Sequence, residues 1–324
     1  MRWPLPILFC LLLLLPAPGA RAGEALEVSA RAVALDPADP ARRAVGGLIW
    51  RGGLELSSPD RRFGGFSGLL VSADGTRLTA ATDRGQLMTA RLVYDAAGDL
   101  AGLDEAALEA LTGLDGKPLE GKQNQDAESL ALAPDGPLLV SFEHEHRIWR
   151  YPLGPAGLAG PPAAFAPAPP IAGLPRNKGL EALASLADGR LVGVTQGRDA
   201  EPDIAVLLLQ DGGWSELRYP KTGIFTPTGA SPLPGGGLLV LERRFTLLGG
   251  PAARLVRVEG AAIRPGAALA GREVAVLRPP LAVDNMEGLA ARRGPGGETL
   301  VYLISDDNFH ILQRTLLLMF ELAQ

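Results

Sequence analysis

An acidic or hydroxyl residue occupies the same place in five copies of a short sequence repeat. It precedes the first residue of an Asp-Gly or Gly-Gly pair by seven residues in four copies and by nine in the fifth. These residues are Ser67, Glu128, Glu181, Thr228 and Glu287. A second polar residue follows the apolar stretch after each pair, and this set is Asp83, Glu143, Gln196, Glu242 and Asp306. Carboxylates gathered from distant parts of a chain repel one another unless a cation lies among them. The repeat therefore indicates a polar site whose oxygen ligands suit Ca²⁺ or another hard ion better than zinc.

Each of these carboxylates also has a simpler interpretation. A single one is expected to cap a strand, accept a loop N–H or pair with a neighbouring arginine, and only the recurrence favours a functional site. Basic residues flank the repeated positions, and these are Arg84, Arg147, Lys178, Arg198 and Arg243. Two interpretations stay open for them: they bind a phosphate or carboxylate group of a ligand, or they neutralise the acids.

The elements that must position these residues are short hairpins. Each copy reads as a strand, a tight Asp-Gly or Gly-Gly turn of the primed type, and a second strand. Strand pairs that recur at this spacing are typical of a β-propeller, where each blade buries one face against the next. A sixth blade is assembled from Val45–Leu56 and Thr315–Leu322, which pair the two ends of the chain. We expect an all-β, six-bladed propeller, with five and seven blades as alternatives.

The composition agrees with one large β-rich domain. The 324 residues include 41 Gly and 28 Pro, which suits many short strands and turns and excludes a coiled coil. The formal net charge of -5 argues against a broad basic surface for nucleic acid. We expect the propeller to span residues 23–324, with a surface helix at Ala101–Leu111 and a loop at Gly154–Pro170.

The first 22 residues have the pattern of a secretory signal peptide. Arg2 precedes a continuous apolar run, Ile7–Leu15, and Ala20-Arg21-Ala22 supplies a cleavage site. The run is too short to span a bilayer, so cleavage after Ala22 is favoured over an uncleaved anchor. The expected product is a periplasmic or secreted protein without stable membrane insertion. It would contain no cysteine, since Cys10 lies in the signal peptide.

Two other patterns are weaker. His144 and His146 alternate with acids, a spacing that suits a transition metal on one strand face, although exposed strand histidines are commoner. Ser67 lies in a segment similar to a serine elbow, but Leu69 stands where the second glycine belongs. A serine hydrolase triad is therefore not expected.

The repeated segments resemble the bacterial phytase-like family, described as "esterase-like activity of phytase". The segments that carry the resemblance are Gly64–Leu69, Thr82–Gly85, Asp126–Leu130, Asn177–Leu183, Asp284–Leu289, Ser305–Phe309 and Gln313–Leu318. Their order and spacing together cover nearly the whole chain after residue 52. The resemblance implies an exported propeller with phosphoester or ester hydrolase activity. Calcium-dependent propeller phytases hold several Ca²⁺ ions among clustered acids.

By that similarity the metal ligands would be Asp83, Glu128, Glu181, Glu287 and Asp306. Arg84 and Lys178 would then orient a phosphate. We expect a monomeric, metal-assisted hydrolase of small phosphate esters or other esters, with Ca²⁺ as the candidate ion and no organic cofactor. The expected catalytic residues are Glu128, Glu181 and Glu287, and the expected substrate-binding residues are Ser67, Arg84, Lys178 and Arg243. The alternative is a non-catalytic propeller whose mouth binds a small ligand, a polysaccharide or a cell-envelope protein.

Overall fold

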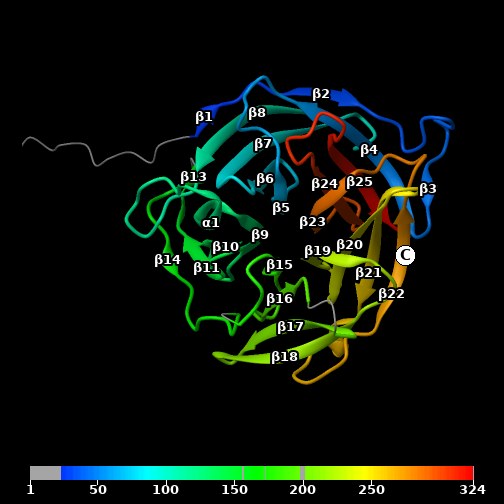
Figure 1. Ribbon diagram of the computed structural model, residues 1–324. Coiled ribbons are helices and arrows are strands. Elements are labelled where there is room, and N and C mark those ends of the chain that lie inside the picture. Colours follow the sequence, from blue (N-terminus) through cyan, green and yellow to red (C-terminus); the bar gives the residue numbers. More distant parts are fainter. Residues whose placement is uncertain (1–22, 155–156, 172, 198–200, 324) are drawn as a thin grey trace, which may run out of the picture.

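The structure is a computed structural model that describes residues 23–154, 157–171, 173–197 and 201–323. Five antiparallel sheets of four or more strands surround a common centre as the blades of a propeller (Figure 1). Strands β5, β9, β15, β19 and β23 lie nearest the centre. The predicted signal peptide, residues 1–22, lies outside the described residues. Within the described ranges the only α-helix is α1 (Lys122–Gln125), and no helix there is long and apolar enough to cross a membrane.

The strands of each blade follow one another from the innermost strand outward. Blade 1 contains β5 (Phe66–Val71), β6 (Arg77–Thr82), β7 (Gln86–Tyr94), β8 (Leu100–Ala110) and β1 (Glu24–Ala25). Blade 2 contains β9 (Ala127–Leu132), β10 (Leu138–Phe142), β11 (Arg147–Tyr151) and β14 (Ala163–Ala164). Blade 3 contains β15 (Leu180–Ser185), β16 (Leu191–Thr195), β17 (Asp203–Gln210) and β18 (Gly213–Pro220). Blade 4 contains β19 (Thr226–Pro232), β20 (Leu238–Thr246), β21 (Gly250–Val258) and β22 (Gly271–Leu277). Blade 5 contains β23 (Asn285–Arg293), β24 (Thr299–Asp306), β25 (Thr315–Leu322), β4 (Leu48–Ser57) and β2 (Ser29–Ala32).

Besides α1, four short elements of the described residues lie outside these rows. Strand β3 (Ala44–Val45) pairs with β4, and β12 (Leu153–Gly154) pairs with β13 (Gly157–Leu158). A single 3₁₀ turn, η1, covers Gly260–Ala262. The stretch predicted to be a loop, Gly154–Pro170, therefore also supplies β13 and β14, of which β14 is the outer strand of blade 2.

The five predicted hairpins are confirmed as the two inner strands of each blade, but the predicted turn type is wrong. Positive φ angles of 78 to 109° occur at the second residue of each pair: Gly75, Gly136, Gly189, Gly236 and Gly297. The first residue of each pair is not in the positive-φ region, whereas a primed turn needs positive φ there. Each glycine N–H donates to the carbonyl three residues earlier, as Gly75 does to Ser72. A type I turn followed by a left-handed glycine therefore joins the strands.

The prediction of six blades is wrong, because the segments assigned to a sixth blade complete the fifth. Strand β4 pairs with β25 from Leu48↔Leu322 to Leu56↔Thr315, and β25 pairs in turn with β24. The sequence shows that both segments are apolar strands, but not that the chain brings them beside the last hairpin. Phe320 and Trp50 pack edge to face at 5.2 Å in the core of this blade.

The surface helix predicted at Ala101–Leu111 is also wrong, since these residues form β8. The buried residues Leu103, Ala106 and Leu108 are separated by three and then two positions. A break in the β7–β8 register causes this spacing, and it coincides with a positive φ of 48° at Glu105. A bulge of this kind interrupts the two-residue alternation of a strand. The altered spacing of apolar residues resembles that of an amphipathic helix.

Candidate active site at the propeller axis

A one-residue bulge lies near the start of the innermost strand of every blade. In blade 1, Phe66 pairs with Thr82 and Gly68 pairs with Ala81, so Ser67 is the extra residue. The same break in register leaves one residue of each other inner strand without a partner on the next strand: Glu128, Glu181, Thr228 and Glu287. A bulge re-aims the side chain of its extra residue. The five residues recognised in the repeat are therefore the five bulged residues of the inner strands.

A small residue follows each bulge because neighbouring inner strands touch at that level. These residues are Gly68, Ser129, Ala182, Gly229 and Gly288. A Cβ atom on Gly229 would lie 2.8 Å from the carbonyl oxygen of Glu287, and one on Gly288 would lie 2.8 Å from Leu69 Cβ. Distances below 3.0 Å are not tolerated without movement, so larger side chains at these two glycines would push the inner strands apart.

The polar residues converge on a cavity of about 250 Å³. Its carboxylates come from four blades and the loops beside them: Asp83, Asp126, Glu128, Glu143, Glu181, Glu287 and Asp306. Among the described residues its cationic side chains are Lys122 and Arg243, and its neutral polar residues are Ser67, Asn177, Gln196 and Asn308. Arg198, which the sequence also places beside this set, lies outside the described residues. The excess of carboxylates over cations makes the cavity a site of strongly negative potential.

Burial and mutual repulsion raise the pKa of the inner carboxyls. The pKa values of Glu128 and Glu181 lie well above the ordinary range, first because of burial and then because other acids of the cavity surround them. Burial raises the pKa of Glu287 to about 7, although Arg243 opposes the shift. Burial also raises the pKa of Asp306 to about 7. Such shifts mark groups that gain from a bound cation or from carrying a proton.

Two basic side chains neutralise part of this charge. Lys122 Nζ lies 3.3 Å from Asp83 Oδ2 and 3.0 Å from Asp126 Oδ1, and so bridges blades 1 and 2. Arg243 Nε lies 2.8 Å from Glu287 Oε1. The simpler interpretation, in which arginines and lysines pair with the acids, therefore holds for part of the set.

Glu181 makes no direct ion pair with any residue that the structure describes, and Arg243 only partly offsets its raised pKa from a distance. The side chain of Glu181 is 7 % exposed, and its Oε1 atom is buried without a hydrogen-bond partner among the described residues. An unsatisfied buried carboxylate oxygen costs about 1–3 kcal/mol or more. Such an atom fits a cation ligand, since a metal ion satisfies the lone pairs that the protein leaves unpaired.

The structure adds a cluster that the sequence interpretation did not assemble. Ligand atoms of Asp126, Glu143 and His144 lie within 4.8 Å of one another, and His144 Nε2 is 3.0 Å from Asp126 Oδ2. His146 does not join it, because its Nε2 atom lies 3.0 Å from the carbonyl oxygen of Pro175. The signal in the sequence was Asp126 itself, which directly precedes the strand that carries Glu128.

Two of the four predicted substrate-binding residues do not line the cavity. Arg84 stacks on the ring of Phe309, 3.2 Å from its centroid, and does not line the cavity. Lys178 lies in the loop before β15 and is likewise absent from the cavity wall. Ser67 lines the cavity, but its hydroxyl donates to the carbonyl oxygen of Ala127 in blade 2.

Blade 4 departs from the repeat. The Thr228 hydroxyl donates to Met286 O, 3.0 Å away in blade 5. Glu242, which was expected on the rim beside Thr228, is 1 % exposed and pairs with Arg254 inside the blade. The next residue, Arg243, lines the cavity instead, because successive strand residues point to opposite faces. This blade therefore presents a cation to the axis where the others present acids or amides.

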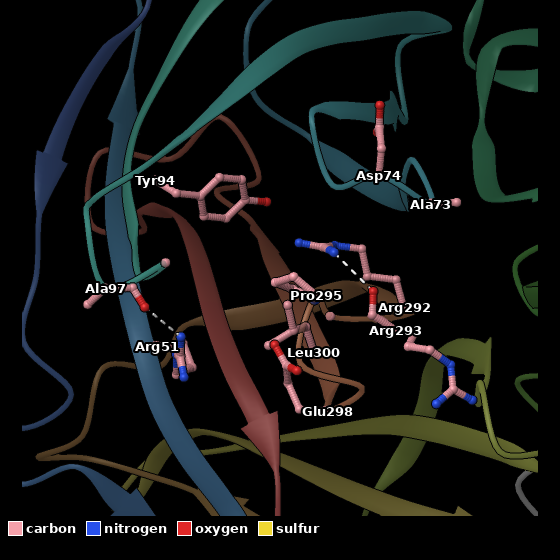
Figure 2. Close-up of a pocket in the computed structure, with 12 residues that line it drawn as sticks. Arg51, Ala73, Asp74, Tyr94, Ala97, Arg292, Arg293, Pro295, Glu298 and Leu300 are labelled. Atoms are coloured by element: carbon pink, nitrogen blue, oxygen red, sulfur yellow. Dashed lines mark hydrogen bonds between the residues drawn. The ribbon is translucent and has the colours of Figure 1, made fainter.

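A second cavity, of about 640 Å³, lies among the hairpin turns at the opposite ends of the inner strands (Figure 2). Its arginines are already bonded. Arg51 pairs with Asp99 and Glu321, Arg292 donates to the Tyr302 hydroxyl, and Arg293 donates to Pro234 O. The wall of this second cavity carries two carboxylates, Asp74 and Glu298, whereas the axial cavity gathers seven, so the axial cavity is the stronger candidate for chemistry.

Comparison with known proteins adds a family and several distant structures. No curated protein matches this chain. A gluconolactonase from Xanthomonas campestris is 15 % identical with a TM-score of 0.45, covering 94 % of this chain and 99 % of that one. The PQQ-bound aldose sugar dehydrogenase from Streptomyces coelicolor is 16 % identical with a TM-score of 0.45, covering 93 % and 99 %. The family described as "Phytase-like: Esterase-like activity of phytase" matches residues 61–309, more than three quarters of the sequence. The chain therefore belongs to the phytase-like family.

Proposed function

We infer that the protein is a hydrolase of phosphate esters or related esters and that its axial cavity holds a divalent cation. The observation that carries this proposal is the unpartnered, buried Oε1 atom of Glu181 within a cavity of seven carboxylates. Burying several acids together is costly unless a cation compensates them. Membership of the phytase-like family supports the choice of ester chemistry.

The donor set fits a hard cation. Glu128 and Glu181 have the most strongly raised pKa values, so they gain most from metal ligation, and Asp83, Glu287 and Asp306 line the same wall. Oxygen donors of this kind suit Ca²⁺. A bound cation would lower the pKa of a water molecule and offset negative charge on an ester or phosphoryl oxygen.

The residues of the chain have distinct roles in this proposal. Arg243 orients the anionic group of the substrate, since its guanidinium is the cation that blade 4 presents to the cavity. Without a cation, Glu287 and Asp306 each have a pKa of about 7, so they carry protons part of the time near neutral pH and would release them when a cation binds. The volume of about 250 Å³ limits the bound part of the substrate to a small group. We further propose a periplasmic or secreted location, which rests on the sequence of residues 1–22.

Hydrolysis assays test the proposal directly. The purified protein is treated with EDTA, then supplied with Ca²⁺, Mn²⁺ or Zn²⁺, and assayed on p-nitrophenyl phosphate and p-nitrophenyl acetate. We expect turnover that EDTA abolishes and one of the metals restores. Absence of turnover with every metal and both substrates would overturn the hydrolase and favour a non-catalytic propeller that binds a ligand at its mouth.

A further inference from the structure

The most exposed apolar side chains that the structure describes gather on the face where the axial cavity opens. Among the described residues, six large apolar ones are more than 60 % exposed: Ile224, Phe245, Leu247, Leu248, Ile311 and Leu312. They belong to three segments that adjoin cavity elements: the loop before β19, the end of β20 with the turn after it, and the loop between β24 and β25. The opposite face carries the turns between the two inner strands of each blade. Among the large apolar residues described beside those turns, Leu132 is the most exposed, at 47 %. This asymmetry indicates a surface that one partner covers.

The turn between β20 and β21 carries the apolar side chain with the largest exposed fraction among the described residues. Leu247 and Leu248 are 95 % and 104 % exposed, and Phe245 beside them is 67 % exposed. Arg243, on the same strand, lines the axial cavity, so the turn lies at the cavity end of blade 4. Two adjacent, fully exposed leucines at a hairpin tip are unfavourable in water and suit insertion among apolar chains.

An arginine-lined cavity of about 600 Å³ lies beside this turn, and Gly249 forms part of its wall. Its charged lining residues are Arg42, Arg244 and Arg278, and no carboxylate among the described residues lines it. Arg42 pairs with Asp36 at 3.3 Å, and Arg244 contacts the Thr246 hydroxyl and the Phe225 ring. Arg278 is exposed and makes no ion pair with any residue that the structure describes. In a chain of net charge -5, this is a local surface of positive charge.

We propose that this face docks on an anionic lipid bilayer, with Leu247 and Leu248 among the acyl chains and Arg244 and Arg278 against the lipid phosphates. A soluble anion would satisfy the arginines alone, whereas a bilayer interface covers leucines and arginines together. A bilayer is also broad enough to contact Ile311 and Leu312, which lie on a separate loop. The acids of the axial cavity do not prevent docking, because Glu181 and Glu287 are largely buried, whereas Arg278 is exposed and the half-buried Arg244 lines the separate arginine-lined cavity.

A fluorescent probe at the turn tests the docking itself. In the chain from Gly23 onward, which contains no cysteine and lacks the apolar run Ile7–Leu15, an environment-sensitive dye is attached through Leu247→Cys or, as the control, through Leu132→Cys on the opposite face. With phosphatidylglycerol vesicles we expect a blue shift at position 247 and none at position 132. Equal shifts at both positions, no shift at 247, or an equal response to phosphatidylcholine vesicles would overturn the proposal. So would a shift at 247 that needs no vesicles and grows with protein concentration, because a second copy would then cover the turn.

Charge-removing variants test the role of the arginines. Each arginine near an anionic surface contributes roughly a fivefold gain in partitioning, so Arg244→Gln with Arg278→Gln should weaken vesicle binding by about 25-fold. Arg77→Gln, an exposed arginine at the turn end of blade 1, is the matched control and should leave binding unchanged. Binding by the double variant equal to that of the parent, with both chains folded by circular dichroism, would refute the proposal. This result is independent of hydrolysis, since neither arginine lines the axial cavity.

Discussion

Arg243 Nε lies 2.8 Å from Glu287 Oε1 and so connects strand β20 of blade 4 with the bulged residue of blade 5 inside the axial cavity. The guanidinium lowers the pKa of Glu287 against the larger effect of burial. Among the described residues it is also the cation that blade 4 contributes to the cavity wall, where the proposed anionic substrate would bind. One residue therefore both tunes a buried acid and offers a binding group.

Arg243→Gln should weaken substrate binding more than it slows the chemical step. Loss of a charge-assisted contact predicts a KM about tenfold higher with a smaller change in kcat. The pKa of Glu287 should also rise above 7, because the opposing charge is gone. Steady-state kinetics across pH measure both effects. Arg84→Gln, which removes an arginine stacked on Phe309 outside the cavity, is the control. Equal KM changes in the two variants would contradict this role.

Glu181→Gln should stabilise the metal-free protein and abolish its response to metal. The amide removes a buried charge whose oxygen has no partner, so we expect a gain of about 1–2 kcal/mol in the free energy of unfolding. Thermal melts with EDTA and with added Ca²⁺ measure both properties. A variant that is less stable in EDTA, yet gains as much from Ca²⁺ as the parent, would argue against cation binding at Glu181.

The stability of the metal-free protein should decrease as pH rises from about 4 to about 7. Burial raises the pKa of Glu287 from 4.5 and that of Asp306 from 3.8, each to about 7. Across this window the folded chain binds more protons than the unfolded chain, so the free energy of unfolding falls, by at most ~1.4 kcal/mol per pH unit for each group.

Urea unfolding in EDTA at pH 5 and pH 7.5 measures this dependence. Saturating Ca²⁺ should remove or reverse it, because metal ligation requires the deprotonated acids. A metal-free protein more stable at pH 7.5 than at pH 5 would show that Glu287 and Asp306 do not govern the pH dependence.

His144→Asn should change the metal preference without disturbing the backbone. His144 has a φ of 57°, and asparagine tolerates this left-handed conformation better than most residues. Loss of the imidazole beside Asp126 and Glu143 predicts at least tenfold weaker Zn²⁺ binding with little change for Ca²⁺, which prefers oxygen. Isothermal titration calorimetry with each ion distinguishes the two. Unchanged Zn²⁺ affinity would remove His144 from the site.

Gly288→Ala should destabilise the protein by about 2–3 kcal/mol, because its Cβ would lie 2.5 Å from Ile304 Cγ2 and 2.8 Å from Leu69 Cβ. Gly235→Ala is the matched control, since no atom lies within 4 Å of a Cβ there. Denaturant unfolding of both variants provides the comparison. Equal effects would mean that the inner strands do not need the small residue after the bulge.

From local information the repeat predicted five hairpins and most of the polar residues that line the axial cavity, with Thr228 and Glu242 as the exceptions. A turn glycine and an alternating strand act within a few residues, so their pattern remains visible in the sequence. The bulges at Glu128 and Glu181 are visible in the repeat as a polar residue followed by a small one. That this pattern marks a bulge can be recognised only from the pairing with the neighbouring strand.

The remaining features depend on contacts between distant segments. The fifth blade is completed by β4 and β25, whose separation in the chain conceals their pairing, and this pairing reduced the expected six blades to five. A register break within β8 gave helical spacing to a strand. Sequence alone therefore determined which residues are polar, repeated and placed at strand ends, because propensity and turn chemistry are local. The tertiary structure decided which of them share a cavity, which have partners and which are buried, because burial and charge pairing arise only when the blades pack together.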